Sequence, residues 1–245
     1  MFSPILVTVV FVVGVLIGGV GIGGVLLVPS LNYFSSVPLH VAIPACMVGY
    51  IFTGLIGAIM YAKQGTINWP LAIKICLGAL PGAYFGGYAL PFLPSYWLGV
   101  AIGFLILASG LDALLRTGRH LHTEPPSDNV ELISIGFITG IGSALTGTGG
   151  PLLLIPILLW RKTPILTAIG LSQAVQVPIS LTATISNMAH SEVDFSLGLS
   201  LALFLGFGAM LGAKFVHVLP IKFLKKMVAS ILVVVGLLIL ARAFS

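Results

Sequence analysis

Apolar residues run along this chain in long stretches that are separated by short polar gaps. A helix needs about 20 apolar residues to cross the hydrocarbon core of a bilayer. Eight such stretches follow one another, at residues 4–34, 38–62, 70–92, 95–115, 131–160, 164–189, 194–217 and 221–244. The pattern therefore predicts an all-α integral membrane protein, with one long polar gap between the fourth and fifth stretches.

A glycine-rich break interrupts two of these stretches in the same way. It reads GIGGVLLVP from Gly21 and GTGGPLLLIP from Gly147, 126 positions later. The same offset pairs Gly14 with Gly140, Leu26 with Leu152, Pro38 with Pro164, Ala42 with Ala168, Gly82 with Gly208, Gly86 with Gly212, Pro94 with Pro220 and Gly110 with Gly236. The chain is therefore two copies of one unit, a first membrane repeat at 1–115 and a second at 131–245, joined by a linker at 116–130. Paired repeats with broken apolar segments are typical of transporters whose site lies between the repeats.

Composition supports the membrane location independently of the repeat. The chain is 58% hydrophobic and 7% charged, with a mean hydropathy of +1.16, whereas a soluble domain carries about 25% charged residues. No soluble shape could bury this much apolar surface, so we expect a multi-pass protein of the cell membrane. The first ten residues carry no basic residue before the apolar run, so a cleaved signal peptide is not expected.

The positions of the basic residues predict the topology. If all eight stretches crossed the membrane, Lys and Arg would divide between the two faces without a usable bias. If the first and fifth stretches are re-entrant hairpins of two half-helices, ten of the eleven basic residues share one face and only Arg242 is opposite. Cytoplasmic loops are enriched in Lys and Arg, which favours the second arrangement. It gives two inverted repeats, each with a re-entrant hairpin plus about three transmembrane helices, a cytoplasmic linker and both termini outside. A single tilted or kinked helix at either position would restore parallel repeats.

The glycine breaks carry the candidate chemistry. Irregular backbone at membrane depth survives only where protein buries it or where it lines a polar cavity. Pro151 predicts the start of a helix directly after the second break. Such a helix end presents free N–H groups and a partial positive charge, which suits an anion. Glycine runs can also serve close packing alone, but two copies at one offset favour a binding role.

The candidate substrate-binding residues are the glycines of the breaks and the polar residues near them. They are Gly21, Gly23, Gly24, Tyr50, Thr146, Gly147, Thr148, Gly149, Gly150, Gln173 and Gln176. Gln173 and Gln176 lie one helical turn apart, and Tyr50 is the counterpart of Gln176 in the first repeat. Ser, Thr and Gln in membrane helices also bond to neighbouring helices, which is the alternative role. No acidic residue is placed at mid-membrane to hold sodium or relay a proton, so an anion fits better than a cation.

Nothing in the sequence predicts catalysis. The five histidines and two cysteines do not cluster, so a metal site and a cofactor are not expected. Ser143 has no plausible histidine partner for nucleophilic chemistry. We therefore expect a protein that is not an enzyme.

The paired motifs, Gly21-Ile22-Gly23-Gly24 to Pro29 and Gly147-Thr148-Gly149-Gly150 to Pro156, resemble those of the sulfite exporter TauE/SafE family of prokaryotic and plant membrane transporters. The resemblance covers essentially the whole chain. The family typically has a third consecutive glycine, where this chain has Val25 and Pro151. The resemblance implies transport of small anions, which in several members are sulfite or organosulfonates such as sulfoacetate.

These observations together predict a multi-pass secondary transporter that moves a small anion by alternating access, and the resemblance implies that this anion is a sulfur oxyanion or an organosulfonate. A passive anion channel would use the same donors without alternation, and a non-transporting membrane subunit is a third alternative. The expected partners are the anionic substrate, the lipid bilayer and a second copy of the chain in a homodimer. No nucleic-acid partner is expected.

Overall fold

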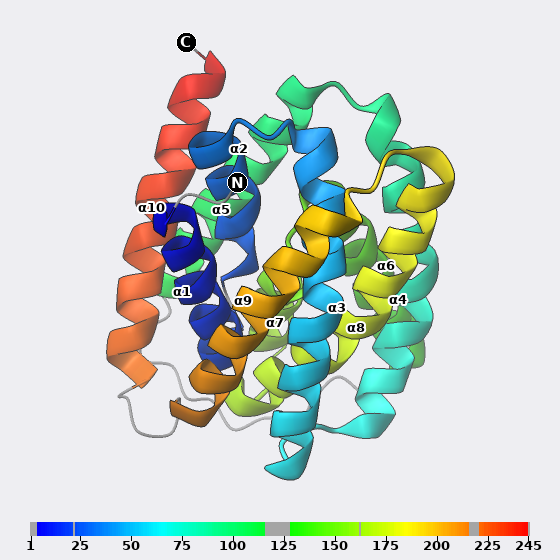
Figure 1. The fold of residues 1–245 in the computed structure, drawn as a ribbon. Coiled ribbons are helices and arrows are strands. Elements are labelled where there is room, and N and C mark those ends of the chain that lie inside the picture. The colour runs from blue at the N-terminus through cyan, green and yellow to red at the C-terminus, as the bar shows by residue number, and fades with distance from the viewer. Residues whose placement is uncertain (1–3, 22, 116–127, 162, 216–220, 245) are drawn as a thin grey trace.

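The computed structural model describes residues 4–21, 23–115, 128–161, 163–215 and 221–244, and every element within them is helical (Figure 1). The predicted first repeat contains α1 (Pro4–Val20), the 3-10 turn η1 (Gly24–Leu26), α2 (Leu27–Ser35), α3 (Leu39–Lys63), α4 (Trp69–Ala89), the 3-10 turn η2 (Leu90–Phe92) and α5 (Ser95–Leu115). The second contains α6 (Asn129–Thr146), α7 (Pro151–Trp160), α8 (Ile165–His190), α9 (Phe195–Phe215) and α10 (Ile221–Phe244). The predicted all-α class is confirmed.

Short polar side chains fix where several helices begin. The side-chain oxygen of Asn68 accepts a hydrogen bond from the N–H of Leu71 at the start of α4 (3.3 Å). Asp128 caps α6 in the same way, and Asp194 accepts from the N–H of Leu197 at 2.9 Å. Such caps satisfy N–H groups that have no partner within the helix. The polar residues between the apolar stretches therefore set the helix boundaries.

Six helices of the described residues are long and apolar enough to cross a membrane, namely α3, α4 with η2, α5, α6, α8 and α9. Five of them coincide with stretches predicted to cross. The sixth, α6, forms the first part of the fifth stretch, where a hairpin was predicted. The eighth stretch forms α10, a helix of 24 residues.

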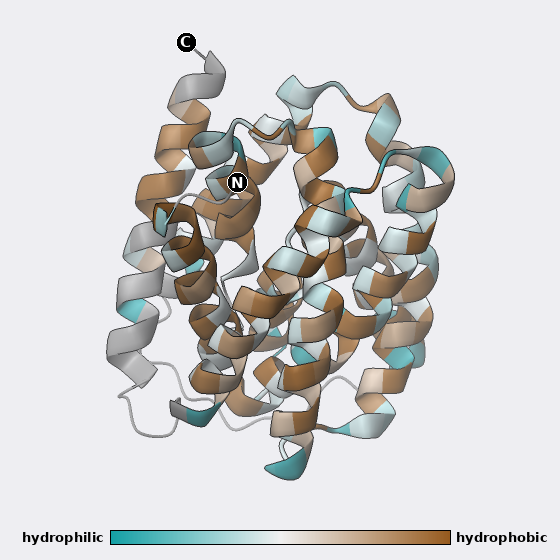
Figure 2. Cartoon of the chain, viewed as in Figure 1, coloured by the Kyte–Doolittle hydropathy of each residue, from teal (hydrophilic) through white to brown (hydrophobic). Residues whose placement is uncertain are grey.

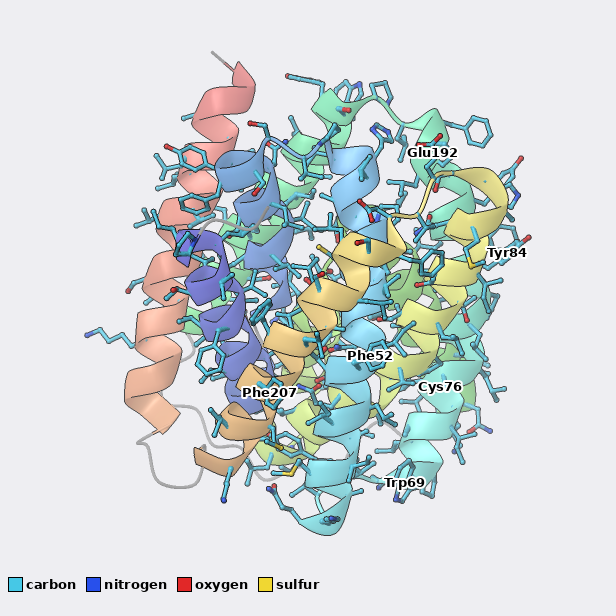
Figure 3. The ribbon with its side chains drawn as sticks, in the orientation of Figure 1. Phe52, Trp69, Cys76, Tyr84, Glu192 and Phe207 are labelled. Atoms are coloured by element: carbon cyan, nitrogen blue, oxygen red, sulfur yellow. The ribbon has the colours of Figure 1, made fainter. Side chains whose placement is uncertain are left out.

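The surface of the bundle suits a bilayer. Figure 2 shows hydrophobic residues along the length of the helices and hydrophilic ones mainly towards their ends. We call the end that holds Glu192 the upper face, and the end that holds Trp69 the lower face (Figure 3). Exposed aromatic side chains lie towards both ends, with Tyr84 nearer the upper face and Trp69 at the lower. Aromatic side chains of this kind anchor proteins at membrane interfaces.

Each glycine break falls past the middle of its segment. The first segment has 17 residues in α1 and 9 in α2, and the second has 18 in α6 and 10 in α7. At 1.5 Å per residue, each longer helix spans roughly 26 Å and each shorter one roughly 14 Å. The structure therefore has one nearly full-length helix and one half-length helix in each segment, instead of the two half-helices that were expected.

Side-chain contacts bring the two ends of the second broken segment together. Arg161, directly after α7, forms an ion pair with Glu131 in the first turn of α6. The indole N–H of Trp160 donates to the Asp112 carboxylate of α5 at 3.1 Å. The start of α6 and the end of α7 therefore lie together beside the end of α5. In Figure 1, the beginning of α1 and the end of α2 lie towards the upper face.

Close contacts at glycines pack α1 against α9 and α6 against α4. A Cβ placed on Gly14 of α1 would lie 2.5 Å from the carbonyl oxygen of Leu205 in α9. One on Gly140 of α6 would lie 2.5 Å from the carbonyl oxygen of Ala79 in α4. These two contacts are related by the same 126-residue offset. The first helix of each repeat therefore packs against a helix of the other repeat, at a separation that excludes any side chain.

Equivalent helices of the two repeats cross in opposite directions. A Cβ on Gly54 of α3 would meet Gln176 of α8, and one on Gly57 would meet Gln173. Residue numbers therefore rise along α3 as they fall along α8. The same holds for α5 and α10, where Gly103 faces Leu240 and Gly236 faces Leu107.

Candidate functional site

The two glycine breaks meet at the centre of the bundle, around the ring of Tyr50. A Cβ on Gly24 would lie 2.9 Å from the carbonyl oxygen of Thr148 and 3.1 Å from the Tyr50 hydroxyl oxygen. A Cβ on Gly149 would lie 2.8 Å from Cδ2 of the same ring. Residues that are more than a hundred positions apart in the sequence are therefore in contact. Only glycine allows the backbone to approach the ring this closely.

The second break uses backbone conformations that favour glycine. Gly147, Gly149 and Gly150 have φ angles of 66°, 77° and 115°. Gly147 ends α6 in the left-handed conformation, and its N–H donates to the carbonyl oxygen of Ser143 at 2.9 Å. Helix α7 then starts at Pro151, as the sequence predicted.

Unpaired backbone donors gather at the start of α7. The N–H groups of Gly149, Gly150 and Leu152 have no hydrogen-bond partner among the described residues. All three residues are buried. The first N–H groups of a helix lack internal acceptors, and the helix dipole adds a partial positive charge there. This break therefore offers the kind of donor that binds an anion.

The two predicted glutamines bridge the repeats. The amide nitrogen of Gln173 donates to the carbonyl oxygen of Ile17 at 2.7 Å. That of Gln176 donates to the carbonyl oxygen of Tyr50 at 3.0 Å and to the Thr53 hydroxyl at 2.8 Å. Both hydrogens of the Gln176 amide are therefore in use. Donation by Gln176 to a substrate would require one of these bonds to open.

The predicted hydroxyl groups also have partners within the protein. Tyr50 donates to the carbonyl oxygen of Gly24 at 2.6 Å. Thr146 donates to the carbonyl oxygen of Gly142 at 2.6 Å, and its own oxygen lies 3.1 Å from the Thr148 hydroxyl. These bonds stabilise the two breaks in the conformation seen here.

The remaining candidates lie around this centre. Gly150 approaches the Cα atom of Gln176. Gly21 would contact the side chain of Ile155 in α7, Gly23 packs back onto α1, and Gly147 packs against Val28 of α2 and Ile43 of α3. Gly24 and Gly149 therefore both approach Tyr50, Gly24 also approaches Thr148, and the other candidates lie around these four residues.

The structure adds polar residues that were not among the site candidates. Besides Oε1 of Gln173, five buried side chains of α6 and α8 carry polar atoms without a hydrogen-bond partner in the described part of the chain: Thr139, Ser143, Ser180, Thr184 and Asn187. Thr139 and Asn187 had no role in the sequence interpretation. Their spacing of three or four residues from neighbouring polar positions was the available signal.

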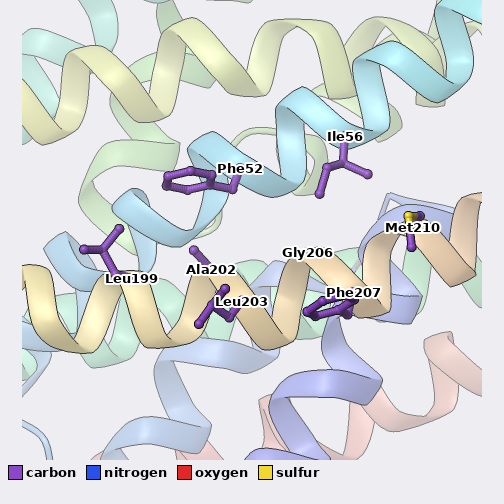
Figure 4. A pocket seen from close by; sticks show the side chains of 8 residues that line it. All are labelled: Phe52, Ile56, Leu199, Ala202, Leu203, Gly206, Phe207 and Met210. Atoms are coloured by element: carbon purple, nitrogen blue, oxygen red, sulfur yellow. The ribbon is translucent and has the colours of Figure 1, made fainter.

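An apolar groove of about 370 Å³ lies between α3 and α9 (Figure 4). Its lining consists of Phe52, Ile56, Leu199, Ala202, Leu203, Gly206, Phe207 and Met210. Since no polar side chain contributes to it, this groove offers nothing to hold an anion. It is part of the apolar surface of the bundle.

Comparison with known proteins adds the family. A family profile described as Sulfite exporter TauE/SafE matches residues 6–239. A probable membrane transporter protein of Methanocaldococcus jannaschii is 31% identical over 260 residues, covering 98% of this chain and 96% of the relative. The probable membrane transporter protein YdhB of Bacillus subtilis is 24% identical over 243 residues, covering 96% and 99%. No solved structure matches the chain.

Proposed function

The chain belongs to the sulfite exporter TauE/SafE family and is a multi-pass membrane transporter, and we propose that it carries a small anion, either a sulfur oxyanion or an organosulfonate. The observation that carries this proposal is the meeting of the two glycine breaks, where buried N–H groups at the start of α7 have no partner among the described residues. The family description names sulfite as cargo, which supports the substrate class. The curated relatives are named as transporters, which supports a role without catalysis.

The chemistry of the interior favours an anion over a cation. None of the buried side chains of the described residues is charged, and the buried groups that carry polar oxygen or nitrogen atoms belong to Ser, Thr, Gln, Asn and Tyr. Sodium ions and protons in transporters are commonly held by intramembrane carboxylates. Backbone N–H groups and neutral hydroxyls are donors, and they stabilise a negative charge.

We propose further that the repeats are inverted and that the broken segments are re-entrant. Equivalent helices that run antiparallel, such as α3 and α8, support this arrangement because they require a two-fold axis across the helices. The ion pair between Glu131 and Arg161 supports a hairpin whose two ends share one face. Lys63, Arg161 and Lys214 end helices at the lower face, so that face would be cytoplasmic and both termini would be outside.

Alternating access would then proceed by rocking of the two repeats about their contact at the breaks. The bonds from Gln173 to Ile17 and from Gln176 to Tyr50 cross between the repeats, so such motion must break and remake them. The substrate would occupy the region of Gly24, Thr148, Gly149 and Gly150. A transporter of this kind binds its anion in one state and releases it in the other.

Uptake by the purified protein in proteoliposomes tests this function. We expect saturable entry of labelled sulfite or sulfoacetate, with weaker entry of sulfate and acetate. Gly149→Leu should abolish uptake, because its side chain would displace the Tyr50 ring. Normal uptake by this variant would contradict the site, and no uptake of any of the four anions by the wild type would contradict the substrate class.

A further inference from the structure

A row of polar side chains follows one face of α8 from the glycine breaks to the helix end. Gln173, Gln176, Ser180, Thr184 and Asn187 are spaced by three or four residues, which places them within an arc of about 80°. None is more than 5% exposed. Leu181 and Ile185, which lie outside this arc, are 47% and 52% exposed. The row therefore faces the interior of the bundle.

The part of this row beyond the glutamines lacks protein partners. The Ser180 and Thr184 hydroxyls and both polar atoms of the Asn187 side chain have no hydrogen-bond partner among the described residues. The Thr139 and Ser143 hydroxyls on α6 also have no hydrogen-bond partner among the described residues. Buried polar groups in native proteins are almost always paired with protein, ordered water or ligand. Since a protein partner is missing here, water or a ligand must complete these groups.

The first repeat builds the same helices without these groups. The positions equivalent to Ser180, Thr184 and Asn187 are Gly54, Ala58 and Tyr61. The Tyr61 hydroxyl is paired, since it lies 3.1 Å from the carbonyl oxygens of Gly18 and Gly19. On α1, the positions equivalent to Thr139 and Ser143 of α6 hold Val13 and Ile17. The fold therefore does not require polar side chains at these positions, and their presence in one repeat alone indicates a role in binding.

We propose that Ser180, Thr184 and Asn187 form a second anion subsite, between the glycine breaks and the end of α8 at His190. This inference rests on the proposed function, because it assigns a second binding site to the same class of anion. Two hydroxyls and one carboxamide N–H₂ can donate to the oxygens of a small oxyanion without a fixed positive charge. Neutral donors hold an anion weakly enough to pass it on. The subsite exists in the second repeat only, so the pathway through the protein is asymmetric.

Cysteine accessibility tests the subsite without depending on transport. Cys46 and Cys76 are first replaced by alanine to remove the native thiols. Ser180→Cys then exchanges one oxygen for sulfur and should react with the anionic reagent 2-sulfonatoethyl methanethiosulfonate. Sulfate or methanesulfonate should slow this reaction several-fold, and the same concentration of gluconate should not. Asn187→Cys provides a second position if Ser180→Cys does not fold.

Two matched control variants test whether modification is specific to the polar row of α8. Leu181→Cys lies on the exposed face of the same helix, where a thiol in lipid cannot ionise and should not react. Ala58→Cys occupies the position equivalent to Thr184 and should also remain unmodified. Reaction at all positions alike would overturn the assignment of a specific pathway.

The outcomes separate the subsite from the proposed function. Modification that small oxyanions do not slow would mean that water alone fills the row, and this would overturn the subsite. A lack of modification at both Ser180→Cys and Asn187→Cys would overturn it as well. Protection by oxyanions together with no flux in proteoliposomes would support the subsite and contradict the transport proposal.

Discussion

The side-chain amide of Gln176 donates a hydrogen bond to the carbonyl oxygen of Tyr50 at 3.0 Å, and these residues occupy the same position in the two repeats. If the repeats are inverted as proposed, two equivalent residues can touch only close to the axis that relates the copies. The Tyr50 ring also borders Gly24 and Gly149. The contact between these equivalent residues therefore lies where the two glycine breaks meet.

Removing the Gln176 amide should destabilise this centre. Gln176→Met keeps the length of the side chain but leaves the Tyr50 carbonyl and the Thr53 hydroxyl without this donor. The Thr53 hydroxyl still donates to the Tyr50 carbonyl at 3.3 Å, so the loss is that of two hydrogen bonds at about 0.5–1.5 kcal/mol each, and we expect a lower temperature of unfolding in detergent. Gln64→Met, at an exposed position, is the matched control. Equal effects of the two changes would show that the bridge does not contribute.

Adding one methyl group at the second break should stop transport. Gly149 and Gly65 both have positive φ angles, 77° and 67°. Alanine at either position carries a similar backbone cost of about 1–2 kcal/mol. Only at Gly149 would the new Cβ meet Tyr50, whereas nothing lies within 4 Å at Gly65. We expect uptake to be lost in Gly149→Ala and kept in Gly65→Ala. Similar flux in the two variants would show that the second glycine break is not part of the substrate site.

The proposed inversion predicts that one equivalent pair lies on opposite sides of the membrane. Pro38 and Pro164 are both exposed and are related by the 126-residue offset. With inverted repeats, Pro38→Cys should be labelled by an impermeant maleimide added outside cells. Pro164→Cys should be labelled only after permeabilisation, because the lower face would be cytoplasmic. Parallel repeats would place both cysteines on the same side.

The exchange of helices between repeats predicts two equal packing defects. Alanine at Gly14 or Gly140 would bring a Cβ within 2.5 Å of a backbone carbonyl on the neighbouring helix. Overpacking of this kind typically costs about 1–3 kcal/mol. Gly99→Ala, where the nearest atom is 3.9 Å away, should be neutral or slightly stabilising because alanine favours helix. Thermal unfolding of the three variants measures the difference, and a stable Gly14→Ala variant would contradict the contact.

Local chemistry explains which features could be predicted from the sequence. Pro151 and the glycines before it predicted both the break and the start of α7, because proline and glycine act on their own backbone. The offset between repeats paired Tyr50 with Gln176, though it did not predict their direct bond. The apolar stretches predicted the helices, because a bilayer requires each spanning segment to be apolar along its length.

Features that depend on tertiary packing could not be predicted in this way. The exchange of α1 and α6 between the repeats follows from close contacts at Gly14 and Gly140, and a glycine in a membrane helix does not specify its partner. Thr139 and Asn187 lie among other polar residues of α6 and α8, and the sequence does not distinguish them from those that have partners. Their lack of protein partners becomes visible only when the neighbouring helices are in place.

The most direct test of alternating access is counterflow in proteoliposomes loaded with unlabelled sulfite or sulfoacetate. Entry of the labelled anion should be faster into loaded vesicles than into empty ones, and it should saturate with concentration, since each return of the binding site can carry cargo. Gly149→Ala vesicles should show neither effect. Uptake that rises linearly with concentration and does not respond to internal anion would contradict alternating access and indicate a passive channel.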